Sequence, residues 1–212
     1  MFRLYYAPGA CSLVPHVALE EIGVAFEPVR LDLAGGEQRR EAYLALNPQG
    51  RVPTLITDRG ALTEVIGIVT FLHRAFPDAG LLPADAFEAG RALELMSWFA
   101  TTLHPAFAQT ARPHRFVDDP AAAAGLAEPG RRRFLAALDR LESFAESSGG
   151  WLAGSTFSMA DVHGLVMRRW AERLGADAAQ WPAWNRAAQR ALARESVQRA
   201  LAREAAPVSA AA

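Results

Sequence analysis

The sequence contains no lysine, so all 22 of its basic residues are arginine. This absence excludes lysine-based chemistry such as catalysis through a Schiff base. The formal net charge is −1, so the chain has no basic excess that would attract nucleic acid or an anionic membrane surface. We therefore expect no nucleic-acid partner and no membrane partner.

Cysteine is almost absent as well, because Cys11 is the only one in the chain. A single cysteine excludes an internal disulfide framework and is typical of a reducing cytosol. The five histidines show no metal-ligand spacing, so we expect no metal site. The sequence also lacks a glycine-rich phosphate loop of the P-loop or dinucleotide type.

No long apolar run occurs, and the N-terminus enters a strand pattern at once. We therefore expect neither a signal peptide nor a membrane span. Together with the single cysteine, this pattern predicts a cytoplasmic protein.

The 212 residues are 51% hydrophobic, which is enough to bury the core of one large domain or two small ones. Residues 1–76 alternate between strand and helix signals in the order βαβαββα, which predicts a small mixed sheet covered by helices. The expected strands are residues 2–6, 26–33, 54–57 and 61–63. The expected helices are residues 12–22, 37–46 and 64–75.

Beyond a linker rich in proline and glycine, strand signals vanish and apolar residues recur at helical spacing. The expected helices there are residues 84–110, 121–146, 159–174 and 183–202. This pattern predicts an α/β domain over residues 1–77, a linker over 78–86 and an all-α helical domain over 87–205. Residues 206–212 are small and apolar without periodicity, and we expect them to be disordered.

Cys11 lies where the first strand meets the first helix, just after the turn Pro8-Gly9. Backbone N–H groups and the positive end of the helix dipole would face the thiol there and would favour the reactive thiolate. Strand-to-helix turns are also where α/β folds place ligands. The alternative is a small buried hydrophobe, as most lone cysteines are, and position alone leaves both interpretations open.

Two further segments of the first half carry candidate binding groups. A cis Val52–Pro53 bond before the third strand would leave the Val52 N–H and C=O for an extended, peptide-like ligand, although trans proline is the commoner form. Glu64 follows Thr63, which could cap the helix expected over residues 64–75. The Glu64 carboxylate either binds the amino group of a ligand or is an ordinary solvated group near a helix start.

A polar stripe lies on the long helix expected over residues 84–110. Ser97, Thr101 and His104 follow one another at i, i+4 and i+7, beside an apolar stripe, and so could face a groove while the helix packs. The sequence therefore gives His104 a modest functional signal. The other alternative is a structural or solvated histidine.

A capping box with aspartate in place of glutamate occurs at Ser158-Met159-Ala160-Asp161. We expect Asp161 to hold the start of a buried helix and to have no catalytic role.

These elements, in this order, resemble the cytosolic glutathione transferases, and most of all the bacterial beta class. The resemblance spans residues 1–204. The segments that carry it are Gly9-Ala10-Cys11-Ser12-Leu13, Pro15-His16, Asn47-Pro48, Gly50, Val52-Pro53, Leu62-Thr63-Glu64, Leu103-His104, Phe157-Ser158 and Ala160-Asp161. It implies a thioredoxin-like N-terminal domain followed by an all-α helical-bundle domain, a cis Pro53 and a two-fold homodimer.

The resemblance also implies glutathione as co-substrate and a small hydrophobic electrophile as its reaction partner, in bacterial detoxification. The catalytic residues it implies are Cys11, Ser12 and His104. The glutathione-binding residues it implies are Cys11, Val52, Pro53, Glu64, Val65, Ser97, Thr101 and His104. In this arrangement the cysteinyl backbone pairs with Val52, and Glu64 and Val65 hold the γ-glutamyl end.

Three positions depart from the family pattern. Val65 replaces a serine that often binds the γ-glutamyl carboxylate, so only its backbone N–H remains, at a helix start that favours an anion. Residues 33–36 lack the lysine that many beta-class members carry near the glycine end of glutathione, and Arg39 or Arg51 could substitute, although neither is in register. Ser97 stands where some relatives have an asparagine thought to reach the ligand of the partner subunit.

Three functions fit these observations. The first is conjugation of glutathione to electrophiles. The second is a glutathione-dependent thiol redox enzyme, in which Cys11 forms a mixed disulfide with glutathione. The third is a non-catalytic binding protein that retains the glutathione-transferase fold, which Val65 and the missing lysine would favour.

Overall fold

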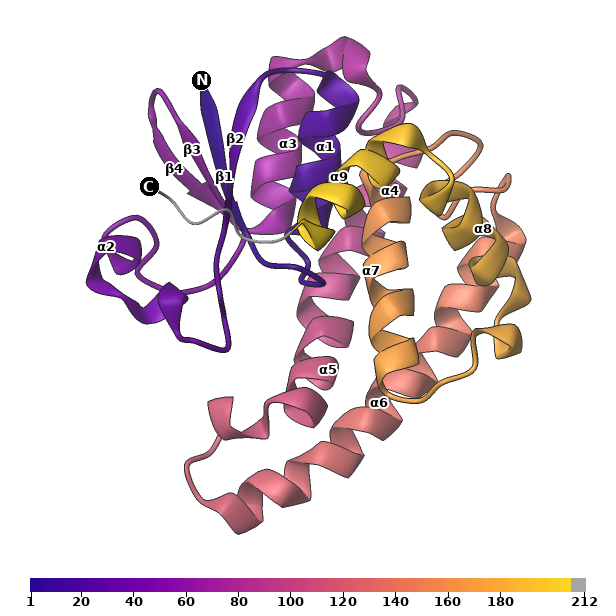
Figure 1. Cartoon of the computed structure of the whole chain (residues 1–212). Coiled ribbons are helices and arrows are strands. Elements are labelled where there is room, and N and C mark those ends of the chain that lie inside the picture. The colour runs from indigo at the N-terminus through magenta and orange to yellow at the C-terminus, as the bar shows by residue number, and fades with distance from the viewer. Residues whose placement is uncertain (207–212) are drawn as a thin grey trace. The chain divides into compact units, whose positions relative to one another are not determined.

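The computed structural model describes residues 1–206 and divides the chain into two compact units. The first unit contains residues 1–82 and the C-terminal segment from Leu192, and the second contains Pro83–Ala191 (Figure 1).

The first unit is built on a four-stranded mixed sheet in the order β2-β1-β3-β4. Its strands are β1 (Phe2–Tyr6), β2 (Phe26–Arg30), β3 (Thr54–Thr57) and β4 (Gly60–Thr63). β1 pairs with β2 in parallel, whereas the β1–β3 and β3–β4 pairs are antiparallel. The predicted order of elements along the chain, βαβαββα, and the mixed α/β class are confirmed.

Helices complete the first unit. They are α1 (Leu13–Ile22), α2 (Glu41–Leu44), α3 (Val65–Ala75) and α9 (Glu195–Ala205). Helix α1 packs against both α3 and α9 (Figure 1). Leu4, Leu13, Leu55 and Ile68 are fully buried, so the core lies where the sheet meets these helices.

Two elements of the first half are shorter than the sequence predicts. The second strand ends at Arg30 because Asp32 forms a turn, in which its carboxylate accepts the Ala34 N–H at 2.9 Å. The helix expected over residues 37–46 is a 3-10 turn, Glu37–Arg39, followed by the four-residue α2. Arg40 has an extended conformation between them (φ −67°, ψ 143°), which breaks the helix.

The second unit consists of helices. They are α4 (Ala86–Trp98), α5 (His104–Ala111), α6 (Pro120–Ser147), α7 (Met159–Arg173) and α8 (Pro182–Leu192). Helices α5 and α6 lie side by side (Figure 1). The α7 residues Met159–Met167 are all buried, so this helix forms the centre of the unit. None of the helices within residues 1–206 is both long and apolar enough to cross a membrane.

The single helix expected over residues 84–110 is interrupted. A π-helical turn, Phe99–Leu103, separates α4 from α5. Such turns insert a local change of register into a helix and occur frequently at functional sites. The spacing of Ser97, Thr101 and His104 is therefore not the plain α-helical spacing that the sequence suggested.

The helix expected over residues 183–202 is two helices, because Arg194 has an extended conformation (φ −70°, ψ 137°). The second of them, α9, belongs to the first unit, although the sequence assigned residues 87–205 to the helical domain. Of the tail expected to be disordered, residues 207–212 lie outside the described residues. The carbonyl of Ala206 accepts a hydrogen bond from Arg30 at 2.9 Å.

Candidate functional site

The strand register brings three segments to one end of the first unit's sheet. Tyr5 lies opposite Thr54, and Thr54 lies opposite Thr63. The end of β1, the start of β3 and the end of β4 therefore meet at the same edge. The segments that continue from these strand ends carry Cys11, the Val52–Pro53 bond and Glu64.

Cys11 lies in the turn that leads into α1. Its side chain is buried, with only 6% exposed, and its Sγ donates to the Val52 carbonyl oxygen at 3.8 Å. The ten-residue α1 begins two positions later and directs the positive end of its dipole toward this turn. The thiol therefore lies beside the Val52 backbone, to which the sequence predicts that a peptide-like ligand binds.

Ser12 is held within the same turn. Its hydroxyl donates to the Ala7 carbonyl at 3.2 Å and accepts the Ala7 N–H at 3.1 Å, and the residue is fully buried. A hydroxyl has one proton to donate, and here the Ala7 carbonyl takes it. The Ser12 hydroxyl therefore holds the turn in this structure, and the catalytic role that the family resemblance implies for Ser12 stays a prediction.

The Val52–Pro53 bond is cis, as the family resemblance implied. Arg51 precedes Val52, and its carbonyl oxygen accepts hydrogen bonds from the Tyr43 hydroxyl at 2.5 Å and from Asn47 at 2.8 Å. Both side chains also bond to Thr54 Oγ1, at 2.8 and 3.0 Å. These four hydrogen bonds hold the segment that presents the Val52 backbone.

Sequence reasoning missed these hydrogen bonds, because it used Asn47 only as one of the residues that carry the family resemblance and gave it no partner. Asn47 and Tyr43 are both buried, and burial raises the pKa of Tyr43, while its hydrogen bonds to Thr54 and Asn47 oppose the shift. The available signal was a polar residue, Asn47, between the expected helix and the expected third strand, because a polar side chain that is buried there needs hydrogen-bond partners.

Glu64 starts α3 in an unusual conformation. It has a φ of +66°, and it is the one residue other than glycine with positive φ within residues 1–206. It occupies the cap position that the sequence assigned to Thr63, and no side-chain hydrogen bond caps the helix there. Positive φ costs a non-glycine residue about 1–3 kcal/mol and concentrates at functional sites.

Val65 is the first residue of α3 and is buried. The N–H groups of a helix's first turn have no partner within the helix, and α3 is eleven residues long. The start of α3 therefore favours an anion.

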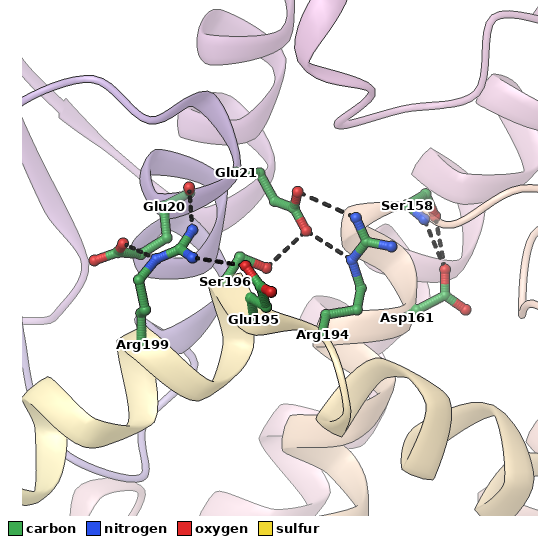
Figure 2. Close-up of polar contacts among 8 residues, drawn as sticks. All are labelled: Glu20, Glu21, Ser158, Asp161, Arg194, Glu195, Ser196 and Arg199. Atoms are coloured by element: carbon green, nitrogen blue, oxygen red, sulfur yellow. Dashed lines mark hydrogen bonds and ion pairs between the residues drawn. The ribbon is translucent and has the colours of Figure 1, made fainter.

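Helix α9 supports α1 through a cluster of charged groups (Figure 2). The Glu21 carboxylate accepts from Arg194 at 2.7 and 3.1 Å and from the Ser196 hydroxyl at 2.7 Å. Glu20 accepts from Arg199 at 2.9 Å. The hydrogen bonds to Glu21 lower its carboxyl pKa against the opposing effect of burial, so Glu21 binds Arg194 as a carboxylate.

The same helix reaches the turn that precedes Cys11. Glu204, which is 4% exposed, accepts the Gly9 N–H at 3.0 Å. Nothing in the local sequence around Cys11 indicated this partner, because the two residues are 195 positions apart.

The second unit holds the other candidates. Ser97 and Thr101 are exposed, and the Thr101 hydroxyl donates to the Ser97 carbonyl at 2.9 Å. His104 begins α5 directly after the π-helical turn, and its ring meets Trp170 edge-on at 4.7 Å. The structure thus brings Cys11, Val52 and Glu64 to one edge of the first unit, while Ser97, Thr101 and His104 belong to the second.

The capping box at the start of α7 is present. Asp161 accepts the Ser158 N–H at 2.8 Å (Figure 2). It also accepts the Leu152 N–H at 2.7 Å. Burial raises the pKa of its carboxyl to about 6, and the hydrogen bonds that it accepts oppose this shift. Within residues 1–206, no group of three or more histidine, cysteine, aspartate or glutamate residues is placed to hold a metal ion.

Comparison with known proteins identifies the class to which this fold and site belong. Residues 1–74 match the family model of the glutathione S-transferase N-terminal domain. Glutathione S-transferase GST-4.5 of Xanthomonas campestris pv. campestris is 33% identical over 198 residues, which cover 92% of this chain and 95% of that protein.

Solved structures agree. A glutathione transferase homologue from Sulfitobacter with bound glutathione superposes with a TM-score of 0.90 at 32% identity and covers 96% of this chain and 98% of its own. A bacterial beta-class glutathione S-transferase from Sphingomonas chungbukensis has a TM-score of 0.81 at 33% identity, with coverage of 96% and 98%. The chain belongs to the glutathione S-transferase family and is most like its bacterial beta class. It is a glutathione transferase with a thioredoxin-like N-terminal domain.

Proposed function

We propose that glutathione binds along the sheet edge of the first unit and reacts there through its sulfur with small hydrophobic electrophiles. The observation that carries this proposal is the position of Cys11 Sγ, 3.8 Å from the Val52 carbonyl and beside the start of α1. One end of the sheet thereby combines a peptide-binding backbone, a thiol and two helix N-termini.

The tripeptide is held at three points in this proposal. Its cysteinyl backbone pairs with the Val52 N–H and C=O, beside the cis Pro53. Its γ-glutamyl carboxylate binds the Val65 N–H at the start of α3, where the helix dipole favours an anion. The Glu64 carboxylate, which is exposed, binds the γ-glutamyl amino group.

Catalysis then consists of favouring the thiolate and positioning it. A free thiol has a pKa of about 8.5, so little glutathione is ionised at neutral pH. Once the glutathione backbone occupies the Val52 carbonyl, the Cys11 thiol can donate to the glutathione sulfur instead, and this hydrogen bond and the α1 N-terminus stabilise the sulfur anion. The thiolate attacks the electrophilic carbon, a sulfur–carbon bond forms, and the electron pair passes to the leaving group or, in an addition, to an atom that takes up a proton.

Substituting Cys11 with alanine tests this role. We expect kcat/KM toward 1-chloro-2,4-dinitrobenzene to fall about 10- to 100-fold, the effect of one hydrogen bond to a charged group. Calorimetric titration with reduced glutathione, using S-hexylglutathione as competitor, measures binding separately. Unchanged activity in Cys11→Ala would remove Cys11 from the chemistry, and absence of glutathione binding in the wild type would overturn the binding mode.

The second candidate function is thiol–disulfide exchange at Cys11, which its position beside Val52 also favours. The Cys11 thiolate would attack a mixed disulfide of glutathione, forming a Cys11–glutathione bond and releasing the other thiolate. A second glutathione thiolate would then release oxidised glutathione and restore Cys11. Intact mass after treatment with oxidised glutathione, together with turnover of hydroxyethyl disulfide, distinguishes this cycle from conjugation.

The roles in glutathione binding of His104, Ser97 and Thr101 remain predictions. His104 lies directly after a π-helical turn, and this position favours a functional role for it. We expect His104→Ala to lower kcat more than it changes glutathione affinity, and an equal effect on both would contradict a role in the chemical step.

We also propose a cytoplasmic bacterial homodimer that acts in detoxification. The relatives above are bacterial, and the single cysteine suits a reducing compartment. Light scattering at working concentration tests the dimer, since a mass near the 22.9 kDa of one chain would refute it.

A further inference from the structure

Two buried side chains converge on the Arg51 carbonyl oxygen. Tyr43 is 4% exposed and Asn47 is 2% exposed, and they donate to this oxygen at 2.5 and 2.8 Å. A carbonyl oxygen has two lone pairs, so these two hydrogen bonds use its full capacity as an acceptor. The direction of the Arg51 carbonyl is therefore determined by side chains that the chain buries for no other contact with the sheet edge.

The protons of these side chains can be arranged in only one way. The Tyr43 hydroxyl gives its single proton to the Arg51 carbonyl, so it must accept from the Thr54 hydroxyl at their contact of 2.8 Å. Asn47 uses both of its amide protons, on the Arg51 carbonyl and on Thr54 Oγ1. Asn47 Oδ1 accepts the Gln49 N–H at 3.1 Å. Each side chain is therefore held in one orientation.

The Arg51 carbonyl belongs to the same peptide group as the Val52 N–H. A trans peptide group is planar, and its C=O and N–H point in opposite directions. The two hydrogen bonds to the carbonyl oxygen therefore also determine where the Val52 N–H points. No group within residues 1–206 accepts that N–H, which leaves it to a ligand.

The same two hydrogen bonds strengthen the Val52 N–H as a donor. Hydrogen bonds that share a peptide group polarise one another, and more so in the interior of a protein than in water. Burial raises the pKa of Tyr43, so its hydroxyl keeps the proton that it donates. Tyr43 and Asn47 thus act on the Val52 N–H from the far side of the peptide group.

We propose that Tyr43 and Asn47 are positioning residues that aim and polarise the Val52 N–H toward the cysteinyl carbonyl of glutathione. This inference rests on the binding mode proposed above and deepens it. The hydrogen bond from Val52 holds the residue that carries the reacting sulfur. We therefore expect the two side chains to affect glutathione binding more than the chemical step.

Tyr43→Phe tests the proposal, because it removes the hydroxyl and keeps the ring. We expect KM for glutathione to rise about fivefold, the effect of one weakened hydrogen bond, and kcat toward 1-chloro-2,4-dinitrobenzene to change less than about twofold. The 15N resonance of the Val52 amide in the ligand-free protein should move upfield, because its peptide group loses polarisation. Asn47→Ala should act in the same direction, since it removes the second donor.

Thr57→Val is the matched control, because Thr57 lies on β3 and its hydroxyl also makes two hydrogen bonds, to the Gly60 carbonyl at 2.9 Å and from the Arg59 N–H at 3.1 Å. It should keep the wild-type KM and Val52 resonance, whatever stability thermal melting shows it to lose. A Tyr43→Phe variant that loses stability but keeps the KM and the resonance of the wild type overturns the proposal. If the wild type binds no glutathione in a calorimetric titration, the proposed function fails and the positioning role with it, a distinct result because no substitution is needed to see it.

Discussion

The hydrogen bond between Glu204 and Gly9 links the C-terminal helix to the turn that carries Cys11. Glu204 is 4% exposed and accepts the Gly9 N–H at 3.0 Å. Substituting Glu204 with alanine removes this acceptor and leaves the amide in a buried environment. Because a hydrogen bond to a charged group contributes about 1.5–3 kcal/mol, we expect the free energy of unfolding to fall by about 2–3 kcal/mol.

Two further variants test whether the loss of stability in Glu204→Ala comes from the hydrogen bond to Gly9. Glu204→Gln keeps an oxygen that accepts the Gly9 N–H and removes only the charge, so we expect a loss of about 1 kcal/mol. Glu195→Ala is the control, because Glu195 belongs to the same helix, its side chain is 94% exposed, and its ion pair with Arg199 is 3.6 Å long. We expect Glu195→Ala to change the free energy of unfolding by less than about 0.5 kcal/mol.

Urea unfolding measures these free energies, and alkylation of Cys11 by iodoacetamide reports on the turn itself. We expect alkylation to accelerate in Glu204→Ala, because the turn before Cys11 loses an anchor, and to stay unchanged in Glu195→Ala. If Glu204→Ala matches Glu195→Ala in both stability and alkylation rate, the argument that α9 holds this turn is refuted.

Three further predictions concern stability. Burial lowers the pKa of His16 from 6.5 to about 4, so between these pH values the unfolded chain binds a proton at this residue and the folded chain does not. Acidification from pH 6.5 to 4 should therefore lower the free energy of unfolding of the wild type by about 3 kcal/mol, a loss that His16→Phe should not show. Urea unfolding at about pH 7.5 and 4.5 measures the difference. Asp161→Ala should cost about 3 kcal/mol in urea unfolding because a buried group with several hydrogen bonds is lost, against about 1 kcal/mol for the exposed cap Asp119→Ala; equal effects would contradict this. Gly130→Ala should lower the melting temperature because its Cβ would meet α5 atoms at 2.9 Å, whereas Gly125→Ala, with nothing within 4 Å, should raise it.

Local patterns in the sequence predicted most of the elements in this fold. The strand at residues 2–6 and the pair around Asp58-Arg59-Gly60 follow from alternation and turn residues, which act within a few positions. The capping box at Ser158 and Asp161 was readable for the same reason, since its partners are three residues apart.

Predictions that depended on distant partners were less complete. The helix expected over residues 183–202 breaks at Arg194, which is held by Glu21, a residue 173 positions away. No periodicity in a helical segment contains that information.

The sequence by itself determined the order of strands and helices and the position of Cys11 at a helix start, because hydrophobic spacing and turn residues act over short stretches of chain. Only the tertiary structure decided which polar groups meet. It placed Glu204 on Gly9, Tyr43 and Asn47 on the carbonyl of Arg51, and α9 on α1. These contacts form because buried donors and acceptors must find partners wherever the folded chain brings them, and that search extends far beyond local sequence.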